Sequence, residues 1–536
     1  MLLSHPLLKL RKLKKKSKII YLLYFLLNRK KIIESYKGYR KLKEQDKLDT
    51  LHKIKSEIMD VDLKYNDAFL NKIIKKNYSE DIFKQFLSNY FLSLGSNFSF
   101  QFYYCISTKK KFIYPLPKEI LIFIDNNYIK VNFFLSNIVW NSYLILFFIR
   151  NILKSFFIYF ETIFYFIRRN KNINNESNIF LGNNNFIDQK FIDRNFFFEQ
   201  LNNTNELKKK NIFIENKKIF DNKNVRNIDN FYFGPKNFYQ LILFSKNFVQ
   251  VLLVVFFKIL KFDLNILIYF DEIIKFFKFK SAQITHTNFI FSDNWTYRPI
   301  WSYFCNQSQN KAIYYFYSSN IEGFRLKNKS NIPFFMFKNL TWDNFVVFDE
   351  YQKNHIIKLI NRTINFYYSL KYPKTEPIIK KNKKIAVFDI NPYKKFETYL
   401  EDVRYESLTF NYRKKFISDI VSFKKKFNLE IFIKPKRSFS LAHHKGYKLY
   451  LNKLKNDKVI EILDPQYDIN KIIQTTDFSI SCPFTSTALI AKSLNRPCIY
   501  YDTTGLVDTD DPAAHNVEII NSFDKLDDFF SFFYES

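Results

Sequence analysis

Residues 478–501 read FSISCPFTSTALIAKSLNRPCIYY, and this stretch decides the fold class of the C-terminal part of the chain. The short apolar runs 478–481 and 498–501 are typical of buried strands, whereas the segment between them has the composition of a short helix. Two buried strands joined through a helix make a βαβ unit, which belongs to a parallel sheet. The stretch therefore predicts an α/β fold.

The same alternation of strand and helix extends from residue 384 to the last residues of the sequence. Strands are predicted at 384–389, 429–433, 459–463, 478–481 and 498–501. Helices are predicted at 412–427, 446–454, 469–474, 487–494 and 523–534. We interpret residues 380–536 as a Rossmann-like domain with a doubly wound parallel sheet, in which ligands bind beyond the carboxyl ends of the strands.

A second α/β domain is predicted at residues 171–372, before a linker that covers 372–377. Its apolar runs, each followed by turn-like residues, lie at 288–291, 312–317 and 345–348, and a helix is expected at 352–368. Residues 171–229 are rich in Asn and Lys and are interpreted as an irregular excursion, although 211–214 has the composition of a short strand. Residues 1–170 are predicted to form a helical, basic and apolar-rich N-terminal region.

The composition excludes several common classes of site. Only 7 of the 536 residues are Gly, and no two of them lie close together, so glycine-rich phosphate loops, dinucleotide fingerprints and nucleophile elbows are absent. The net charge of +33 accompanies a general abundance of Lys, Asn, Ile, Phe and Tyr, and we attribute most of it to that bias rather than to nucleic-acid binding. The charge still favours anionic partners such as nucleotide phosphates and acidic lipids.

Neither a metal site nor a disulfide framework is expected. The four Cys residues have no CxxC spacing, which is typical of reduced thiols in the cytoplasm. His443 and His444 have no partner at metal-ligand spacing, and a loop beside the cleft is the simpler interpretation. The run Asp508-Thr509-Asp510 has the pattern of a metal clamp for a nucleotide diphosphate, but it leads into Asp511-Pro512 and is interpreted as a capped loop. No cofactor is therefore predicted.

Three apolar segments raise the question of a membrane. Residues 19–27 follow a basic run, are too short to span a bilayer and lack small residues for cleavage, so a basic amphipathic helix is expected there. Residues 138–167 and 241–260 are strongly apolar but contain charged residues, which disfavours spanning. Core packing is the simplest expectation for both, with docking on an anionic membrane surface and spanning as alternatives. The protein is expected in the cytoplasm, with a peripheral position on the inner face of the membrane.

Two predicted strand ends carry residues that suit an anion. The candidate donor-binding residues are Lys434, Lys436, Arg437, Pro483, Thr485, Ser486 and Thr487. The last three lie at the expected start of a helix, where free backbone N–H groups and the positive end of the helix dipole favour a phosphate. Ser and Thr are also common helix caps without any ligand, but the basic residues at a neighbouring strand end favour an anion site.

Several of these stretches resemble the family of bacterial polysaccharide-biosynthesis proteins named for its PFTS motif. The resemblance is carried by Ile480–Ala488, Ala491–Pro497, Phe432–Arg437, Ala386–Asp389 and Asp508–His515, within roughly residues 285–536. More broadly, this half is similar to the donor-binding half of GT-B glycosyltransferases. In their branches that transfer sialic acid and Kdo, a Ser/Thr pair at a helix start holds the nucleotide phosphate. Lys434-Pro435 stands where those branches have a His-Pro pair.

The resemblance implies two Rossmann-like domains that face a cleft, and transfer of a sugar from a nucleotide-sugar donor to a saccharide or lipid-linked saccharide acceptor. A CMP-activated donor and inverting chemistry without a metal are expected. Inverting transfer needs a carboxylate base, for which Asp293 is the first candidate, with Glu322 and Asp343 as rivals. The simpler interpretation of Asp293 is a turn or helix cap. A non-catalytic binding protein that keeps the nucleotide-binding half as a scaffold is the alternative function.

Overall fold

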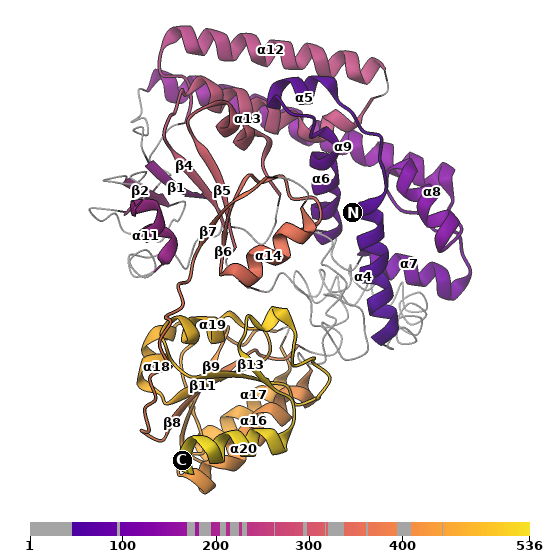
Figure 1. Ribbon diagram of the computed structural model, residues 1–536. Helices are drawn as coiled ribbons and strands as arrows, with labels where there is room; N and C mark the ends of the chain where they lie inside the picture. The colour runs from indigo at the N-terminus through magenta and orange to yellow at the C-terminus, as the bar shows by residue number, and fades with distance from the viewer. Residues whose placement is uncertain are drawn as a thin grey trace.

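The computed structural model describes most of the chain. The described residues are 45–93, 97–168, 177–181, 195–203, 211–214, 225–227, 233–261, 263–292, 297–316, 318–319, 337–360, 363–393, 409–441 and 443–535. Two parallel sheets, each with helices packed around it, lie one above the other in Figure 1. The apolar run 19–27 lies outside the described residues.

The first sheet has seven parallel strands in the order β3-β2-β1-β4-β5-β6-β7. Its strands are β1 (Ser177–Leu181), β2 (Asn211–Ile214), β3 (Val225–Asn227), β4 (Asn288–Phe291), β5 (Lys311–Tyr315), β6 (Asn344–Val347) and β7 (Asn365–Tyr368). The chain starts in the middle, winds to one edge and then returns to build the other half, which is the doubly wound order of a Rossmann-like domain. The side chains of β4 and β6 are buried throughout, as expected for strands covered on both faces.

Two predictions for this domain are wrong. The Asn- and Lys-rich segment is not wholly an irregular excursion: β2 confirms the short strand expected at 211–214, and β1 and β3, which were not expected, complete one half of the sheet with it. The helix expected at 352–368 ends early: α14 covers Glu350–Leu359, and β7 follows it as an edge strand paired with β6. The side chains of β7 are only partly buried, so its pattern lacks the continuous apolar character that identified the central strands.

The second sheet has six parallel strands in the order β10-β9-β8-β11-β12-β13, the same doubly wound order. Its strands are β8 (Lys384–Asp389), β9 (Glu430–Pro435), β10 (Glu461–Ile462), β11 (Phe478–Ser481), β12 (Cys498–Tyr501) and β13 (Glu518–Ile520). Its helices are α16 (Phe410–Phe427), α17 (Lys445–Asn456), α18 (Ile469–Thr475), α19 (Ser486–Ser493), η6 (Pro512–Ala514) and α20 (Phe523–Glu535). The sequence predicts these elements, except for the three-residue edge strand β13 and the single-turn helix η6.

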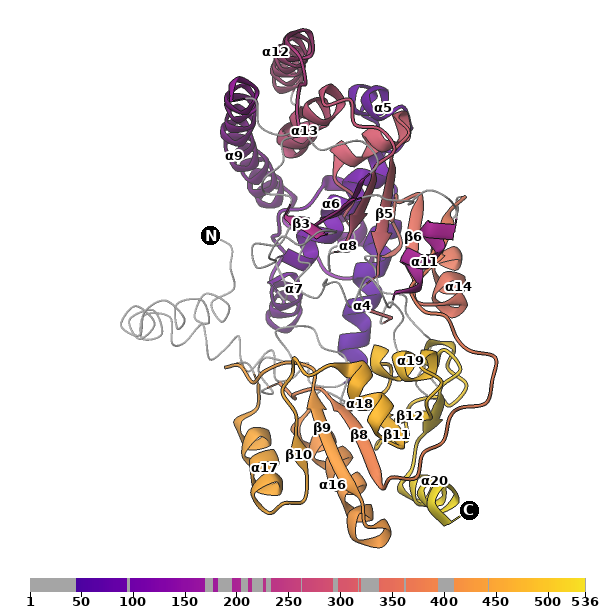
Figure 2. The same cartoon turned by 90° about the vertical axis from the view of Figure 1, so that its left-hand side faces the viewer.

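The remaining helices belong to the N-terminal half of the chain. They are α4 (Gln45–Asp60), α5 (Ala68–Ile74), α6 (Ser79–Ser93), α7 (Asn97–Thr108), α8 (Lys118–Asn127), α9 (Phe133–Ile167), α11 (Phe196–Asn203), α12 (Phe238–Leu260), η2 (Asn265–Tyr269), α13 (Phe270–Ser281) and η3 (Ile300–Gln307). One continuous buried cluster joins α4–α9 to the first sheet, so this helical region shares the core of the first Rossmann-like domain. Both views place α9, α12 and α13 together, at the end of the molecule farthest from the second sheet (Figures 1 and 2).

Helices α9 and α12 contain the two apolar segments whose position the sequence left open. Both are long and apolar enough to cross a membrane by length and composition alone. Only 22% of the most apolar window of each is buried, because each helix packs through one narrow stripe. The stripe on α12 comprises Gln240, Phe244, Phe248, Val251 and Val255. Core packing, the simplest expectation, is therefore wrong for most of the apolar side chains of these helices.

The carboxyl edges of the two sheets face each other. Ser319, which follows β5, contacts Ser486 at the start of α19. Asp349, which follows β6, contacts His515 in the segment between β12 and β13. Two Rossmann-like domains arranged in this way make a GT-B-like fold. The site expected at the carboxyl ends of the strands therefore lies where the domains meet.

Candidate functional site

The strand order of the second sheet reverses between β8 and β11, and this is where a doubly wound sheet binds its ligand. β8 ends at Asp389, whose side chain is completely buried. The Asp389 carboxylate accepts a hydrogen bond of 2.8 Å from the Tyr447 hydroxyl and lies 3.5 Å from Nη1 of Arg413. Burial raises the pKa of Asp389, although Arg413 and Tyr447 favour the ionised form.

Arg413, on the first turn of α16, is a buried cation with unused donors. Its side chain is 0% exposed, and its Nε and Nη2 have no hydrogen-bond partner among the described residues. A buried guanidinium normally satisfies its donors with carboxylates, carbonyls or phosphates, because leaving them unpaired costs about 1–3 kcal/mol or more. The sequence signal for Arg413 was weak, since it lies inside a helix of mostly basic and apolar residues.

Lys436 and Arg437 extend this positive charge to the surface. Both are exposed, directly after β9, and the Lys436 backbone N–H donates to the Asp389 carbonyl. Desolvation by the surrounding chain lowers the pKa of Lys436, and repulsion from Arg437 and Arg413 lowers it further. Arg413, Lys436 and Arg437 are called the cationic rim below.

Lys434 does not share this arrangement. Its Nζ donates a hydrogen bond of 2.8 Å to the Pro465 carbonyl in the loop after β10. Burial lowers the pKa of Lys434, against the attraction of Asp464. The ammonium group is thus held toward the β10 side of the sheet, and a donor-binding role for it stays a prediction.

The loop from β11 to α19 contains the predicted Pro483, Thr485, Ser486 and Thr487. Phe484 turns the chain in the left-handed region, with φ of 63°, a conformation that is unusual for a large side chain. Thr485 is the N-cap of α19, as predicted, but its side chain makes no capping bond. Its hydroxyl instead lies 3.1 Å from that of Thr487, which is 2.9 Å from the Ser481 hydroxyl. Two of the three predicted hydroxyls are therefore engaged within the loop.

The third hydroxyl, of Ser486, lies between the domains. It accepts a bond of 3.3 Å from the Ser319 backbone N–H, and the two Ser hydroxyls are also 3.3 Å apart. Ser486 therefore joins the start of α19 to the segment after β5 of the first domain.

Asp349 forms a second contact between the domains. Nδ1 of His515 lies 2.7 Å from each oxygen of the Asp349 carboxylate, and both side chains are 5% exposed. The same carboxylate accepts a hydrogen bond of 2.6 Å from the Tyr372 hydroxyl and one of 3.2 Å from the Gln352 backbone N–H. The second bond caps the N-terminus of α14. Burial alone would raise the pKa of Asp349, but these bonds and the charge of His515 outweigh it and lower the pKa.

The candidate bases have different positions. Asp293 and Glu322 lie outside the described residues. Asp343 precedes β6, and so lies at the amino end of that strand rather than at the carboxyl edge. It pairs with Nη1 of the buried Arg298 at 2.8 Å and with Lys76 at 3.1 Å. Burial would raise the pKa of Asp343, but Arg298 and Lys76 lower it, which is typical of a structural ion pair.

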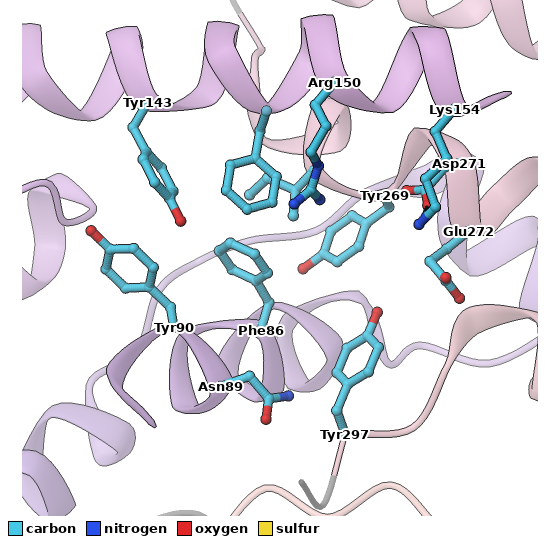
Figure 3. Close-up of a pocket in the computed structure, with 12 residues that line it drawn as sticks. Phe86, Asn89, Tyr90, Tyr143, Arg150, Lys154, Tyr269, Asp271, Glu272 and Tyr297 are labelled. Atoms are coloured by element: carbon cyan, nitrogen blue, oxygen red, sulfur yellow. Dashed lines mark hydrogen bonds and ion pairs between the residues drawn. The ribbon is translucent and has the colours of Figure 1, made fainter. Parts of the chain in front are cut away.

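A cavity of about 430 Å³ lies between α6, α9 and the start of α13 (Figure 3). Aromatic rings of Phe86, Tyr269 and Tyr297 border it, and Arg150 and Lys154 come from α9. The remaining lining residues are Asn89, Tyr90, Tyr143, Phe147, Ile268, Asp271 and Glu272. Three buried polar atoms of this lining have no partner among the described residues: Asn89 Oδ1, Tyr269 Oη and Glu272 Oε2. The sequence analysis did not identify this cavity, because its walls come from four separate segments.

Within the described residues, no group of three or more His, Cys, Asp or Glu side chains is arranged to hold a metal ion. Asp508 accepts from the Asp510 N–H in a turn, and Asp511 caps η6, as expected for a capped loop. His443 accepts from the Ser440 N–H, and the ring of His444 stacks on Phe410 at 4.5 Å.

The solved structures that the chain resembles include TarM, a UDP-GlcNAc 2-epimerase and a glycosyltransferase. S. aureus TarM is 11% identical at a TM-score of 0.31, covering 49% of this chain and 52% of its own. UDP-GlcNAc 2-epimerase from Methanocaldococcus jannaschii is 12% identical to this chain, with a TM-score of 0.34. The match covers 67% of this chain and 92% of the epimerase chain. A glycosyltransferase from Rickettsia africae ESF-5 is 11% identical, with a TM-score of 0.31. The match covers 67% of this chain and 89% of the glycosyltransferase chain. These TM-scores lie below 0.5, so the fold assignment rests on the two sheets themselves.

The chain spans about half the length of TarM and of the matched chain in the GtfA/B complex. No curated protein matches it. The family described as "Polysaccharide biosynthesis PFTS motif protein" matches residues 256–530, more than half of the chain and all of both sheets except β1, β2 and β3. This chain is a member of the polysaccharide biosynthesis PFTS motif family.

Proposed function

We propose that this protein is a glycosyltransferase of surface polysaccharide biosynthesis that takes a sugar from a nucleotide-sugar donor. The observation that carries the proposal is the buried Arg413, whose unused N–H donors lie at the switch point of the second sheet. Two exposed cations, Lys436 and Arg437, adjoin it, and the first domain faces this edge. A donor phosphate supplies the acceptor oxygens that this guanidinium lacks.

The proposed reaction is an inverting transfer without a metal. The acceptor hydroxyl attacks the anomeric carbon, a carboxylate takes its proton, and the bond from that carbon to the phosphate oxygen breaks. The cationic rim and the start of α19 stabilise the negative charge that develops on the leaving nucleotide. Asp293 stays the proposed base, and CMP stays the favoured nucleotide. The cytoplasm, at the inner face of the membrane, is the proposed location.

A nucleotide screen tests this proposal. A nucleotide that binds only the folded protein raises the melting temperature, by the equivalent of about 2.7 kcal/mol at a concentration of 100 Kd. We expect CMP to give a larger shift than UDP, GDP or TDP. The double variant Lys436→Gln/Arg437→Gln should lose the shift, whereas Lys453→Gln/Lys455→Gln, with the same charge change on the exposed end of α17, should keep it.

The same experiment distinguishes the glycosyltransferase from the alternative function, a non-catalytic scaffold protein. A scaffold protein would keep the nucleotide shift but leave a matching nucleotide sugar intact during prolonged incubation with acceptor extracts. If no nucleotide stabilises the protein, the donor site proposed here does not exist.

We further propose that the cavity between α6 and α9 binds the acceptor saccharide. Aromatic rings suit the apolar faces of sugars, and the unpartnered oxygens of Asn89, Tyr269 and Glu272 suit their hydroxyls. Tyr297, on its wall, follows Asp293 by four residues, a reach of at most about 14 Å.

Loss of two of these groups should weaken acceptor binding. We expect the double variant Tyr269→Phe/Glu272→Gln to raise the acceptor KM about tenfold or more, since hydrogen bonds of this kind contribute about 1–3 kcal/mol. The donor KM should not change. Tyr65→Phe removes another buried, unpartnered hydroxyl outside the cavity and is the matched control. Equal acceptor KM values in both variants would exclude the cavity.

A further inference from the structure

The exposed faces of α9 and α12 form the most apolar surface of the described chain. Of the 32 large hydrophobic side chains that are exposed, these two helices carry 21. On α9 they are Phe134, Leu135, Ile138, Ile145, Leu146, Ile149, Leu153, Phe156, Phe157, Phe160, Phe164 and Ile167. On α12 they are Phe238, Tyr239, Ile242, Leu243, Val249, Leu253, Phe256, Phe257 and Leu260. This set, called the apolar surface below, is far larger than the scattered exposed residues of a typical soluble protein.

The opposite side of α9 is fixed to the protein by polar contacts. Asn151 is buried and donates to the carbonyls of Leu267 and Ile268. Along the same helix, Lys154 pairs with Asp271 at 2.5 Å and Glu161 pairs with Lys278 at 3.1 Å. A helix surrounded by lipid would have to expose these groups to hydrocarbon or break their bonds, and either is costly. The helix therefore contacts lipid on one side only.

The length of α9 leads to the same conclusion. Its 35 residues extend over roughly 52 Å, well beyond a hydrocarbon core of about 30 Å. A helix of this length that is bound to protein along one side suits a position in the plane of the interface.

The charges on the exposed side are all of one sign. Apart from Lys154, which is paired with Asp271, the exposed ionisable residues within α9 and α12 are Arg150 and Lys246, and Arg168 and Lys261 directly follow the two helices. The acidic Glu161 is partly buried against Lys278. Basic residues beside an apolar face match a membrane surface that carries anionic lipids. A second copy of the same basic face would instead repel this one.

We propose that the apolar surface docks in the plane of an anionic lipid bilayer, with α9 and α12 partly immersed and neither helix crossing it. The second sheet lies at the other end of the molecule from α12 and α13 in both views, so the second domain stays in water (Figure 2). The wall of the cavity formed by Arg150 and Lys154 is on the same helix as the immersed face, so the cavity lies next to the membrane. This inference does not depend on the proposed function.

Vesicle flotation of the full chain tests the inference. We expect the protein to float with vesicles of phosphatidylcholine and phosphatidylglycerol at 70:30, and at least about tenfold less with pure phosphatidylcholine. The double variant Leu146→Glu/Leu153→Glu should bind the mixed vesicles at least about tenfold less than the wild type, because it places two carboxylates on the immersed face.

The matched control is Leu449→Glu, in which an equally exposed Leu on α17 is changed. It should float like the wild type, and all variants should show the wild-type circular dichroism spectrum and elution volume. Three results would overturn the inference: wild-type protein that does not float, a protein that resists extraction with alkaline carbonate and therefore spans the bilayer, or a dimer that the Glu variants dissociate.

Discussion

Replacing Arg413 with Lys is expected to lower kcat/KM for sugar transfer by at least about a hundredfold, the usual effect of removing one preorganised donor to a developing anion. Lys keeps the positive charge beside Asp389, so the buried pair survives. It loses the planar guanidinium, whose Nε and Nη2 are the donors left without partners. The measurement is steady-state kinetics with the nucleotide sugar that the nucleotide screen identifies.

Arg496→Lys is the control for this substitution. Arg496 is also a buried arginine of the second domain, but its terminal nitrogens have partners. Nη1 donates a hydrogen bond of 2.6 Å to the Ile378 carbonyl, and Nη2 donates one to the Thr476 carbonyl. The substitution Arg496→Lys should lower the melting temperature and leave kcat/KM near the wild-type value. If Arg413→Lys affects stability and activity no more than Arg496→Lys does, Arg413 is a structural residue only.

Substitution of Asp349 by Ala should lower the free energy of unfolding by about 3–5 kcal/mol, because it leaves several buried donors without their acceptor, at about 1–3 kcal/mol each. The change leaves His515, the Tyr372 hydroxyl and the N-terminus of α14 without their shared acceptor. Urea unfolding measured by Trp fluorescence reports the loss. A double-mutant cycle with His515→Ala should give a coupling energy of about 1–3 kcal/mol, whereas near-zero coupling would mean that the contact does not hold the domains together.

The pKa of Asp349 gives this prediction a dependence on pH. Because the pKa is lowered in the folded protein, the carboxylate contributes its stability above its ordinary value of about 3.9. That contribution is lost as the pH falls through the lower folded value. Between pH 5 and pH 2, the wild type should therefore lose more stability than Asp349→Asn, and parallel curves would contradict the assigned cause.

The sequence predicts the second domain well because its signal is local. Strands such as β8, β11 and β12 are short, continuous apolar runs between polar turns, and their bounds agree with the sequence prediction. Strands β1 and β3 were missed because they lie in Asn- and Lys-rich sequence, where pairing with neighbours rather than composition makes the strand.

The candidate site could be predicted only in part for a related reason. Lys436 and Arg437 follow directly from a strand end, but Arg413 comes from the preceding helix, and its role depends on burial that no local pattern reveals. Asp349 and His515 are 166 residues apart, so only the packing of two domains brings them together. The same limit applies to the cavity on α6 and α9.

Phe484 has a consequence for the motion of the two domains. Its left-handed backbone costs of order 1–3 kcal/mol, which burial of its ring against Tyr500, in an apolar cluster that also includes Phe348 of the first domain, offsets. When the domains separate, this cluster loses Phe348 while the backbone cost remains. Opening of the molecule should thus loosen the turn that presents α19, so that in the proposed transferase the release of the nucleotide and domain opening become one linked event.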